Sequence, residues 1–209
     1  MDAFINLLKN VVSESMPGKQ AQMKMMPRIK NSLDRFSIEA KKGAKQGAVL
    51  ILLYYKNGKI YFPLTQRHEY DGAHSGQVSF PGGKVEHGDF SLEHTALRET
   101  EEEIGVPQLE VNILGKLTDL FIIASNFNVQ PVIGFIENAP EFCLNTREVA
   151  EVIEISIDQL LDDSLQKEKE IAFIKNTKIQ APYFDFNGYH VWGATAMMLA
   201  EFKEILKNI

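Results

Sequence analysis

Four of the five residues from 99 to 103 are glutamates. On a helix of 3.6 residues per turn, Glu99, Glu102 and Glu103 stand at positions i, i+3 and i+4 and share one face, whereas Glu101 points elsewhere. Like charges at this spacing repel each other, and a bound cation is the best reason to keep them together. Oxygen-only ligands suit Mg²⁺ or Mn²⁺, which also accept phosphate oxygens. The spacing therefore predicts metal-assisted phosphate chemistry, with Glu99, Glu102 and Glu103 as metal ligands.

A sharp turn, Phe80-Pro81-Gly82-Gly83, precedes this helix. Paired glycines let the backbone approach a metal or a phosphate where a Cβ atom would collide. A plain tight turn is the alternative interpretation, and it is less favoured beside the glutamates. We therefore expect Gly82 and Gly83 to contact the substrate.

The segment from Gly83 to Val106 resembles the signature of the Nudix hydrolases. In that signature a glycine and an acidic residue precede the string Arg-Glu-aliphatic-x-Glu-Glu-x-Gly-aliphatic. Here Arg98 begins the string, and Thr100 stands where the family usually has an aliphatic residue. The resemblance extends over about three quarters of the chain, from roughly Ala48 to Phe202. It implies an α/β fold, with a Nudix-type mixed β-sheet sandwiched between α-helices.

The chain also resembles the coenzyme A diphosphatase-like branch of that family. Asp89 lies nine positions before Arg98, one more than in the general signature, and the branch has the same longer loop. The branch motif Leu-Thr-x-Arg, followed by Gly-x-x-x-Phe-Pro-Gly-Gly, is matched at 64–67 and 76–83. The branch usually has Ser or Ala after the first arginine and a second arginine in the loop, where this chain has His68 and Gly72.

The resemblance implies that all three glutamates take part in catalysis without fixing their roles. Glu99 and Glu103 are the principal predicted ligands, and Glu102 is either a third ligand or the group that takes a proton from water, so we assign Glu102 and Glu103 as catalytic. Arg98 is expected to orient a neighbouring carboxylate. Substrate contacts are predicted for Arg67, which could bind a phosphate or be a solvated edge charge, and for His74.

The predicted function is a metal-dependent hydrolase that cleaves the diphosphate bond of a nucleoside diphosphate linked to another moiety. Coenzyme A or a derivative is the leading substrate, giving 3',5'-ADP and 4'-phosphopantetheine. ADP-ribose, nucleotide sugars and dinucleotides are alternatives within this class. A non-catalytic Nudix-fold binding or regulatory module is the second class, but the intact glutamates favour an enzyme. Glu148 and Glu151 could supply an extra carboxylate, although a solvated face is the preferred interpretation.

The composition is that of an ordinary globular protein of 209 residues, 44% hydrophobic and 24% charged. The longest apolar run, Ala48 to Tyr55, is far shorter than the ~20 residues that cross a bilayer, so no membrane span is expected. The single cysteine, Cys143, cannot form an internal disulfide, which fits a cytoplasmic location. A net charge of -6 argues against nucleic-acid polymers as partners. A small nucleotide substrate that approaches the acidic helix would need a cation between its phosphates and the glutamates. A homodimer stays open.

The first part of the chain, residues 1–46, is predicted to be a helical extension packed on a Nudix domain of residues 47–209. A helical face of Phe4, Leu7, Leu8 and Val11 precedes a break at Pro17-Gly18. Strands at 48–55 and 60–66 flank Asn57-Gly58, which is a strong hairpin signal.

The glutamate helix is expected to begin after a cap at Asp89 or Ser91 and to end at Gly105. Strands follow at 110–117 and 127–136, and Pro131 suggests that the second of these is an edge strand or carries a bulge. The remaining predictions are a strand at 149–155, a helical turn at 157–161, a strand pair of 170–174 and 183–192 around Asn187-Gly188, and an amphipathic closing helix from Ala194.

Overall fold

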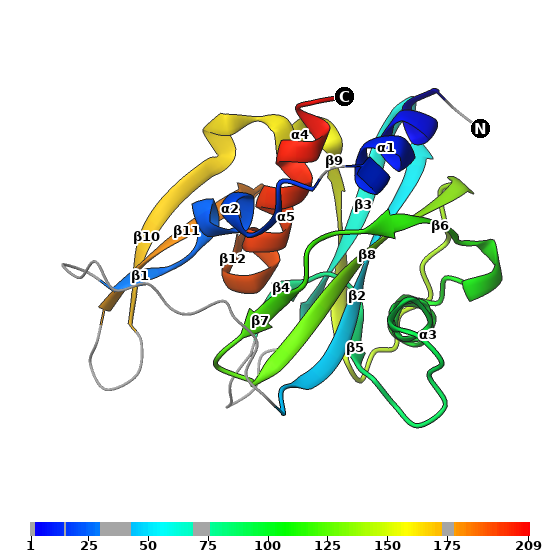
Figure 1. Cartoon of the computed structure of the whole chain (residues 1–209), viewed down its shortest axis with the longest axis horizontal. Helices are drawn as coiled ribbons and strands as arrows, with labels where there is room; N and C mark the ends of the chain where they lie inside the picture. Colours follow the sequence, from blue (N-terminus) through cyan, green and yellow to red (C-terminus); the bar gives the residue numbers. More distant parts are fainter. Residues whose placement is uncertain (1–2, 15, 30–42, 69–75, 173–177) are drawn as a thin grey trace.

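A computed structural model describes residues 3–14, 16–29, 43–68, 76–172 and 178–209. Its centre is a mixed sheet of eight strands, with helix α3 on one side and helix α5 on the other (Figure 1). Successive side chains of the long strand β2 (Lys45–Lys56) point alternately to the two faces of this sheet. Leu50 and Leu52 pack with residues of α3, and Ile51 and Leu53 pack with residues of α5. The predicted mixed sheet between helices is confirmed.

The hairpin of β2 and β3 (Lys59–Arg67) closes with Lys56 opposite Lys59. Asn57 and Gly58 have φ angles of 52° and 74°, as the two central residues of a type I′ turn require. The predicted hairpin is confirmed, and it carries Arg67 to the far end of β3.

The eight-stranded sheet has the order β4-β3-β2-β8-β6, and β5, β7 and β9 add to it by pairing with β2, β8 and β3. Strands β2 and β8 are parallel, and every other pair in this sheet is antiparallel. The remaining bounds are β4 Val78–Ser79, β5 Gly82–Lys84, β6 Asn112–Lys116, β7 Leu120–Ile122, β8 Phe127–Asn138 and β9 Val149–Ser156. A short 3-10 helix, η2 (Gln108–Glu110), replaces the start of the strand that was predicted from 110.

The prediction that Pro131 marks an edge strand is wrong, and the bulge that β8 does carry lies at Ile136–Asn138 rather than at Pro131. Strand β8 is internal, with β2 on one side and β6 and β7 on the other. The carbonyl of Pro131 accepts a hydrogen bond from the Leu117 N–H at 2.9 Å, and Leu117 lies between β6 and β7. The proline therefore sits where its partner strand is interrupted, and the N–H that it lacks falls in that interruption.

A second sheet contains β1 (Arg28–Ile29), β10 (Gln166–Ala172), β11 (Lys178–Phe186) and β12 (Tyr189–Trp192). Strands β11 and β12 form a hairpin around Asn187 and Gly188, so the predicted turn is confirmed. The single strand predicted at 183–192 is instead two strands divided by this turn, and the strand predicted from 170 begins at Gln166. Two short helices connect β9 to β10. They are α4 (Ile157–Leu161), which also matches its prediction, and the 3-10 helix η3 (Asp163–Leu165).

The closing helix α5 (Gly193–Leu206) is not the one-sided amphipathic helix that was predicted, because 11 of its 14 residues are buried. Helices α1 (Ala3–Glu14) and α2 (Gly18–Gln22) and the 3-10 helix η1 (Met23–Met25) belong to the same side of the molecule as α5 (Figure 1). The buried stripe of α1 is Ile5, Leu8 and Val12, whereas the predicted Leu7 is 43% exposed.

Candidate active site

The glutamates lie on the last turns of α3 (Leu92–Ile104). The Ser91 hydroxyl caps its start by accepting a hydrogen bond from the His94 N–H at 3.1 Å. Gly105 ends it with a φ of 74°, and its N–H donates to the Glu101 carbonyl at 2.9 Å. The sequence prediction of this helix and of both of its ends is confirmed.

Glu99 and Glu103 face Gly82 and Gly83, which begin strand β5 rather than completing the sharp turn that was predicted. The Gly82 N–H donates a hydrogen bond to Glu103 Oε2 at 3.2 Å. The Glu99 carboxylate lies so close to Gly83 that a Cβ atom there would collide with it. Gly83 itself is paired with Ala48 in β2. Gly83 therefore leaves room for the Glu99 carboxylate, and Gly82 holds Glu103 through its N–H.

Burial changes the chemistry of Glu103, which is only 4% exposed. Loss of solvent raises the pKa of its carboxyl group to about 7, against the opposing effects of the Gly82 N–H and Arg67. The neighbouring charges of Glu99 and Glu148 raise this pKa further. Burial also raises the pKa of Glu99, while Arg98 opposes the shift. Both carboxylates are thus destabilised as anions, and a positive charge between them would stabilise them.

Arg98 organises the outer side of this cluster. Its Nε and Nη2 atoms donate to the two oxygens of Asp89 at 3.0 Å each, which is a bidentate pair. The same guanidinium donates to Glu99 Oε1 at 3.1 Å and to Glu102 Oε2 at 3.0 Å. The prediction that Arg98 pairs with neighbouring carboxylates is confirmed.

Asp89 is more than the cap or turn residue that was predicted. Its side chain is 2% exposed and accepts hydrogen bonds from the Thr95 hydroxyl and the Glu86 N–H as well as from Arg98. The hydrogen bonds from Arg98 hold the pKa of this carboxyl group well below its usual range, although burial acts in the opposite direction. Asp89 therefore remains charged and fixes the guanidinium.

The three predicted metal ligands differ in their surroundings. Glu102 has a side chain that is 56% exposed and is held by Arg98, whereas Glu99 and Glu103 are turned toward β5. Within the described ranges, no group of three or more His, Cys, Asp or Glu side chains is already arranged to hold a metal ion. Nevertheless, the donors present are all carboxylate oxygens in a strained anionic cluster, which is the chemistry that Mg²⁺ or Mn²⁺ needs. Their role as ligands stays a prediction.

Arg67 lies beside Glu103 at the end of β3. Its Nη2 atom is 3.8 Å from Glu103 Oε1, and its side chain is 41% exposed. The pairing of β3 with β9 becomes irregular here, because Gln66 lies opposite Glu151 but Arg67 lies opposite Val149. Such a bulge is common next to active sites, where it changes the direction of a side chain. The other predicted loop contact, His74, lies outside the described residues, as does Gly72.

The solvated role that the sequence favoured for Glu148 agrees with its exposed side chain. Its negative charge nevertheless contributes to the raised pKa of both Glu99 and Glu103. Glu151 instead accepts a hydrogen bond from the Tyr189 hydroxyl at 2.8 Å. A sequence signal for Glu148 existed in its place directly before β9, but only the pairing of that strand with the end of β3 brings it to the glutamates.

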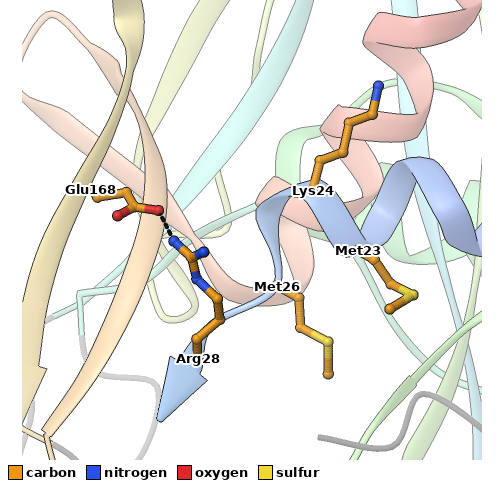
Figure 2. A pocket seen from close by; sticks show the side chains of 5 residues that line it. All are labelled: Met23, Lys24, Met26, Arg28 and Glu168. Atoms are coloured by element: carbon orange, nitrogen blue, oxygen red, sulfur yellow. Dashed lines mark hydrogen bonds and ion pairs between the residues drawn. The ribbon is translucent and has the colours of Figure 1, made fainter. Parts of the chain in front are cut away.

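A separate hollow of about 240 Å³ lies between η1 and β10 and is lined by Met23, Lys24, Met26, Arg28 and Glu168 (Figure 2). Arg28 and Glu168 form an ion pair across it, and Lys24 pairs with Glu204 at 2.9 Å. None of these lining residues is a predicted site residue. The hollow is therefore distinct from the candidate site at the glutamates.

The sequence model of the NUDIX domain matches residues 44–175. The chain belongs to the Nudix family. A Nudix hydrolase of Yersinia pestis (strain Pestoides F), described as the uncharacterized Nudix hydrolase NudL, is 36% identical over 137 residues, which are 65% of this chain and 67% of that protein. A NudL protein of Yersinia pseudotuberculosis serotype O:1b (strain IP 31758) matches equally well. The protein is therefore a Nudix hydrolase that acts on a diphosphate.

Solved structures support the same fold. The Nudix hydrolase RenU of M. smegmatis is 18% identical, with a TM-score of 0.54, and the match covers 88% of this chain and 95% of that one. The MutT protein of Methanosarcina mazei Go1 is also 18% identical, with a TM-score of 0.52, over 82% of this chain and 100% of that one. In the described parts of the chain, no helix is both long and apolar enough to cross a membrane.

Proposed function

We propose that this Nudix hydrolase uses Mg²⁺ or Mn²⁺ to cleave coenzyme A or a derivative of it to 3',5'-ADP and 4'-phosphopantetheine. The observation that carries the metal-dependent activity is the approach of two carboxylates, the buried Glu103 and the half-buried Glu99, to Gly82 and Gly83 of strand β5. The choice of coenzyme A rests on the resemblance of residues 64–67 and 76–89 to the coenzyme A diphosphatase-like branch.

In this proposal Glu99 and Glu103 hold the cation, and Glu148 adds negative charge beside them. A bound cation supplies charge neutralisation on the phosphoryl oxygens and makes water more acidic. Glu102 is exposed and fixed by Arg98, so its second oxygen is available to take a proton from water or to join the ligands. The backbone at Gly82 and Gly83 leaves room for a phosphate oxygen.

Arg67 is the proposed partner of the substrate diphosphate. Its guanidinium stands next to the buried carboxylate of Glu103 but is 3.8 Å away and partly exposed, which is too far for a tight ion pair. Several of its N–H donors are thus able to bind a phosphate in a bidentate manner. His74 would add a second contact from the loop that follows.

A substrate panel tests the assignment. Coenzyme A, ADP-ribose, nucleotide sugars and dinucleotides are incubated with Mg²⁺ and with Mn²⁺, and the products are separated by chromatography. Coenzyme A should give 3',5'-ADP and 4'-phosphopantetheine. Brisk turnover of ADP-ribose or a nucleotide sugar, without cleavage of coenzyme A or its thioesters, would exclude the coenzyme A assignment.

ADP-ribose or a nucleotide sugar is the second candidate because of His68. The branch usually has a small Ser or Ala at this position, whereas here the imidazole binds the Thr146 carbonyl at 2.9 Å. This contact ties the segment after Arg67 to Thr146, and a Ser or Ala side chain is too short to make it, so the surroundings of Arg67 depart here from the branch pattern.

The carboxylate pair predicts a strict need for a divalent cation. Replacing Glu103 by Gln removes a ligand charge, and we expect kcat to fall on the order of 100-fold, or roughly 3 kcal/mol of transition-state stabilisation. The matched control is Glu101→Gln, because Glu101 lies on the same helix but is exposed and bound to Gln108. Full activity of the wild type in excess chelator, or of Glu103→Gln with metal, would contradict the proposal.

A further inference from the structure

Two segments flank Glu103 and meet at His68. One is the end of β3, which carries Arg67. The other is the loop of residues 143–148, which carries Glu148 into β9. The His68 Nε2 atom lies 2.9 Å from the Thr146 carbonyl oxygen. A carbonyl oxygen only accepts, so Nε2 must carry the proton and donate it.

The 143–148 loop is first attached to the end of α3. The Cys143 N–H donates to the Ile104 carbonyl at 3.0 Å, and the Asn145 N–H donates to the Glu103 carbonyl at 2.9 Å. The last carbonyls of a helix have no partners within it, so the loop satisfies two of them. This attachment joins the loop to the backbone of Glu103 itself.

The loop then turns sharply before β9. The Asn145 side-chain oxygen accepts from the Arg147 N–H at 3.2 Å, and the Asn145 carbonyl accepts from the N–H groups of Glu148 and Val149 at 3.0 Å each. On the β3 side the neighbouring ladder is irregular, since Arg67 pairs with Val149 but Gln66 pairs with Glu151. A bulge weakens the backbone hydrogen bonds between β3 and β9 at this point. The hydrogen bond from the His68 side chain to Thr146 therefore contributes more to holding the two segments together.

We propose that His68 is a positioning residue whose imidazole ties the 143–148 loop to the end of β3 and so holds Glu148 beside Glu99 and Glu103. The proposal rests on the proposed hydrolase site, but not on which diphosphate is the substrate. The end of β3 is also held by the bond from the Arg67 N–H to the Gln77 carbonyl at 3.0 Å. The imidazole therefore adds a tie at Thr146, between the attachment of the loop to α3 at Asn145 and the start of β9.

Kinetics give the first test, with the diphosphate that the wild type hydrolyses fastest. His68→Ala should lower kcat by about 10-fold with little change in KM, because a small displacement of a group at the reacting centre is costly. His68→Gln should recover most of the rate, since its amide N–H can reach the same carbonyl. His190→Ala is the matched control, because His190 is an exposed histidine in β12 and should leave kcat unchanged.

A double-mutant cycle identifies the residue through which His68 acts. If His68 positions Glu148, then His68→Ala should cost little further activity once Glu148→Gln is present. The same full loss in both backgrounds would overturn the proposal. A raised KM with unchanged kcat would also overturn it, because His68 would then contact substrate directly.

Amide hydrogen exchange in the substrate-free protein tests the tie without any turnover. His68→Ala should speed exchange at the amides of Arg147, Glu148 and Val149 by about fivefold, and His68→Gln should not. Unchanged exchange in His68→Ala would overturn the proposal. If the wild type hydrolysed no diphosphate, the proposed function would be wrong, but the exchange rates would still test whether His68 holds the loop.

Discussion

Asp89 and Glu103 are both buried carboxyl groups, yet their surroundings move their pKa values in opposite directions. Asp89 meets Arg98 through two hydrogen bonds, so its anion is stabilised. Glu103 meets one N–H and a more distant arginine, so loss of solvent dominates and its pKa rises to about 7. Asp89 supports the structure, whereas the anion of Glu103 is left short of positive charge. By this contrast Asp89 is a structural carboxylate, whereas Glu103 is a carboxylate that a bound cation would stabilise.

Asp89→Asn should destabilise the protein by about 3 kcal/mol at neutral pH, because it leaves the Arg98 charge without its main partner. The folded pKa of Asp89 lies below its unfolded value, so its stabilising effect is complete above about pH 4 and is lost as the pH falls through the folded pKa. The difference in unfolding free energy between wild type and variant should therefore be constant from pH 5 to 7 and shrink in acid. Denaturant titrations at several pH values measure it.

The control for this variant is Asp158→Asn, which removes an exposed carboxylate from the surface pair with Lys59. Surface pairs of this kind contribute little, so its unfolding free energy should stay close to that of the wild type. An equal loss in both variants would mean that the bidentate pair does not hold the site.

At the scale of elements, the parts that could be predicted are those whose signals are local. Asn57-Gly58 determines its own turn, and Ser91 and Gly105 mark the ends of α3 within a few residues. Pro131 could not be interpreted in this way, because what accommodates it is a break between two other strands. The place of Glu148 is equally non-local, since it depends on how β9 pairs with β3.

The buried faces of helices were also predicted poorly for a physical reason. The spacing of Phe4, Leu7, Leu8 and Val11 fits a helix, but Ile5 and Val12 fit one as well, and only the packing partner selects between the two stripes. Helix α5 is covered by other parts of the protein on most of its surface, so even Glu201 is buried. Its carboxylate accepts hydrogen bonds from Gly18, Gln22 and Thr118, which the spacing within one helix cannot reveal.

Strand β5 pairs with β2 and packs against α3. Substitutions of its two glycines should have different effects. An alanine at Gly82 would collide with backbone atoms of Ala48 and Val49 at a φ of 150°, so Gly82→Ala should cost about 2 to 4 kcal/mol of stability. The three atoms nearest to an added carbon at Gly83 all belong to the end of the Glu99 side chain, which can rotate away. Gly83→Ala should therefore keep most of its stability but lose activity.

Thermal unfolding and kcat of both variants test this division. Gly88→Ala is the control, because Gly88 has a φ of 120° with open space around the added carbon, and it reports backbone strain alone. Retained activity in Gly83→Ala would show that Glu99 need not occupy its present place.

At the scale of the whole molecule, the eight-stranded sheet separates two hydrophobic cores that support different elements. The core on the α3 side is the smaller cluster, formed by residues such as Leu50, Ala96 and Ile104, and it supports the glutamate helix. The larger core on the other side joins α1, η1 and α5 to the opposite face of β2 (Figure 1). We propose that residues 3–14 and 18–26 form an integral part of this larger core, even though the family match begins at residue 44. Strand β2 itself begins at Lys45, within the predicted extension.

Two adjacent leucines on α1 test this proposal. Leu8 is fully buried in the larger core, whereas Leu7 is 43% exposed. Leu8→Ala should lower the unfolding free energy by about 2 to 5 kcal/mol, the usual cost of a cavity in a packed core, and Leu7→Ala should change it by less than about 1 kcal/mol. Because α1 lies across the sheet from α3, Leu8→Ala should leave kcat nearly unchanged below its unfolding temperature. Equal midpoints for the two variants in thermal unfolding would mean that α1 is a loosely attached extension whose contacts with the larger core contribute nothing to the stability of the enzyme.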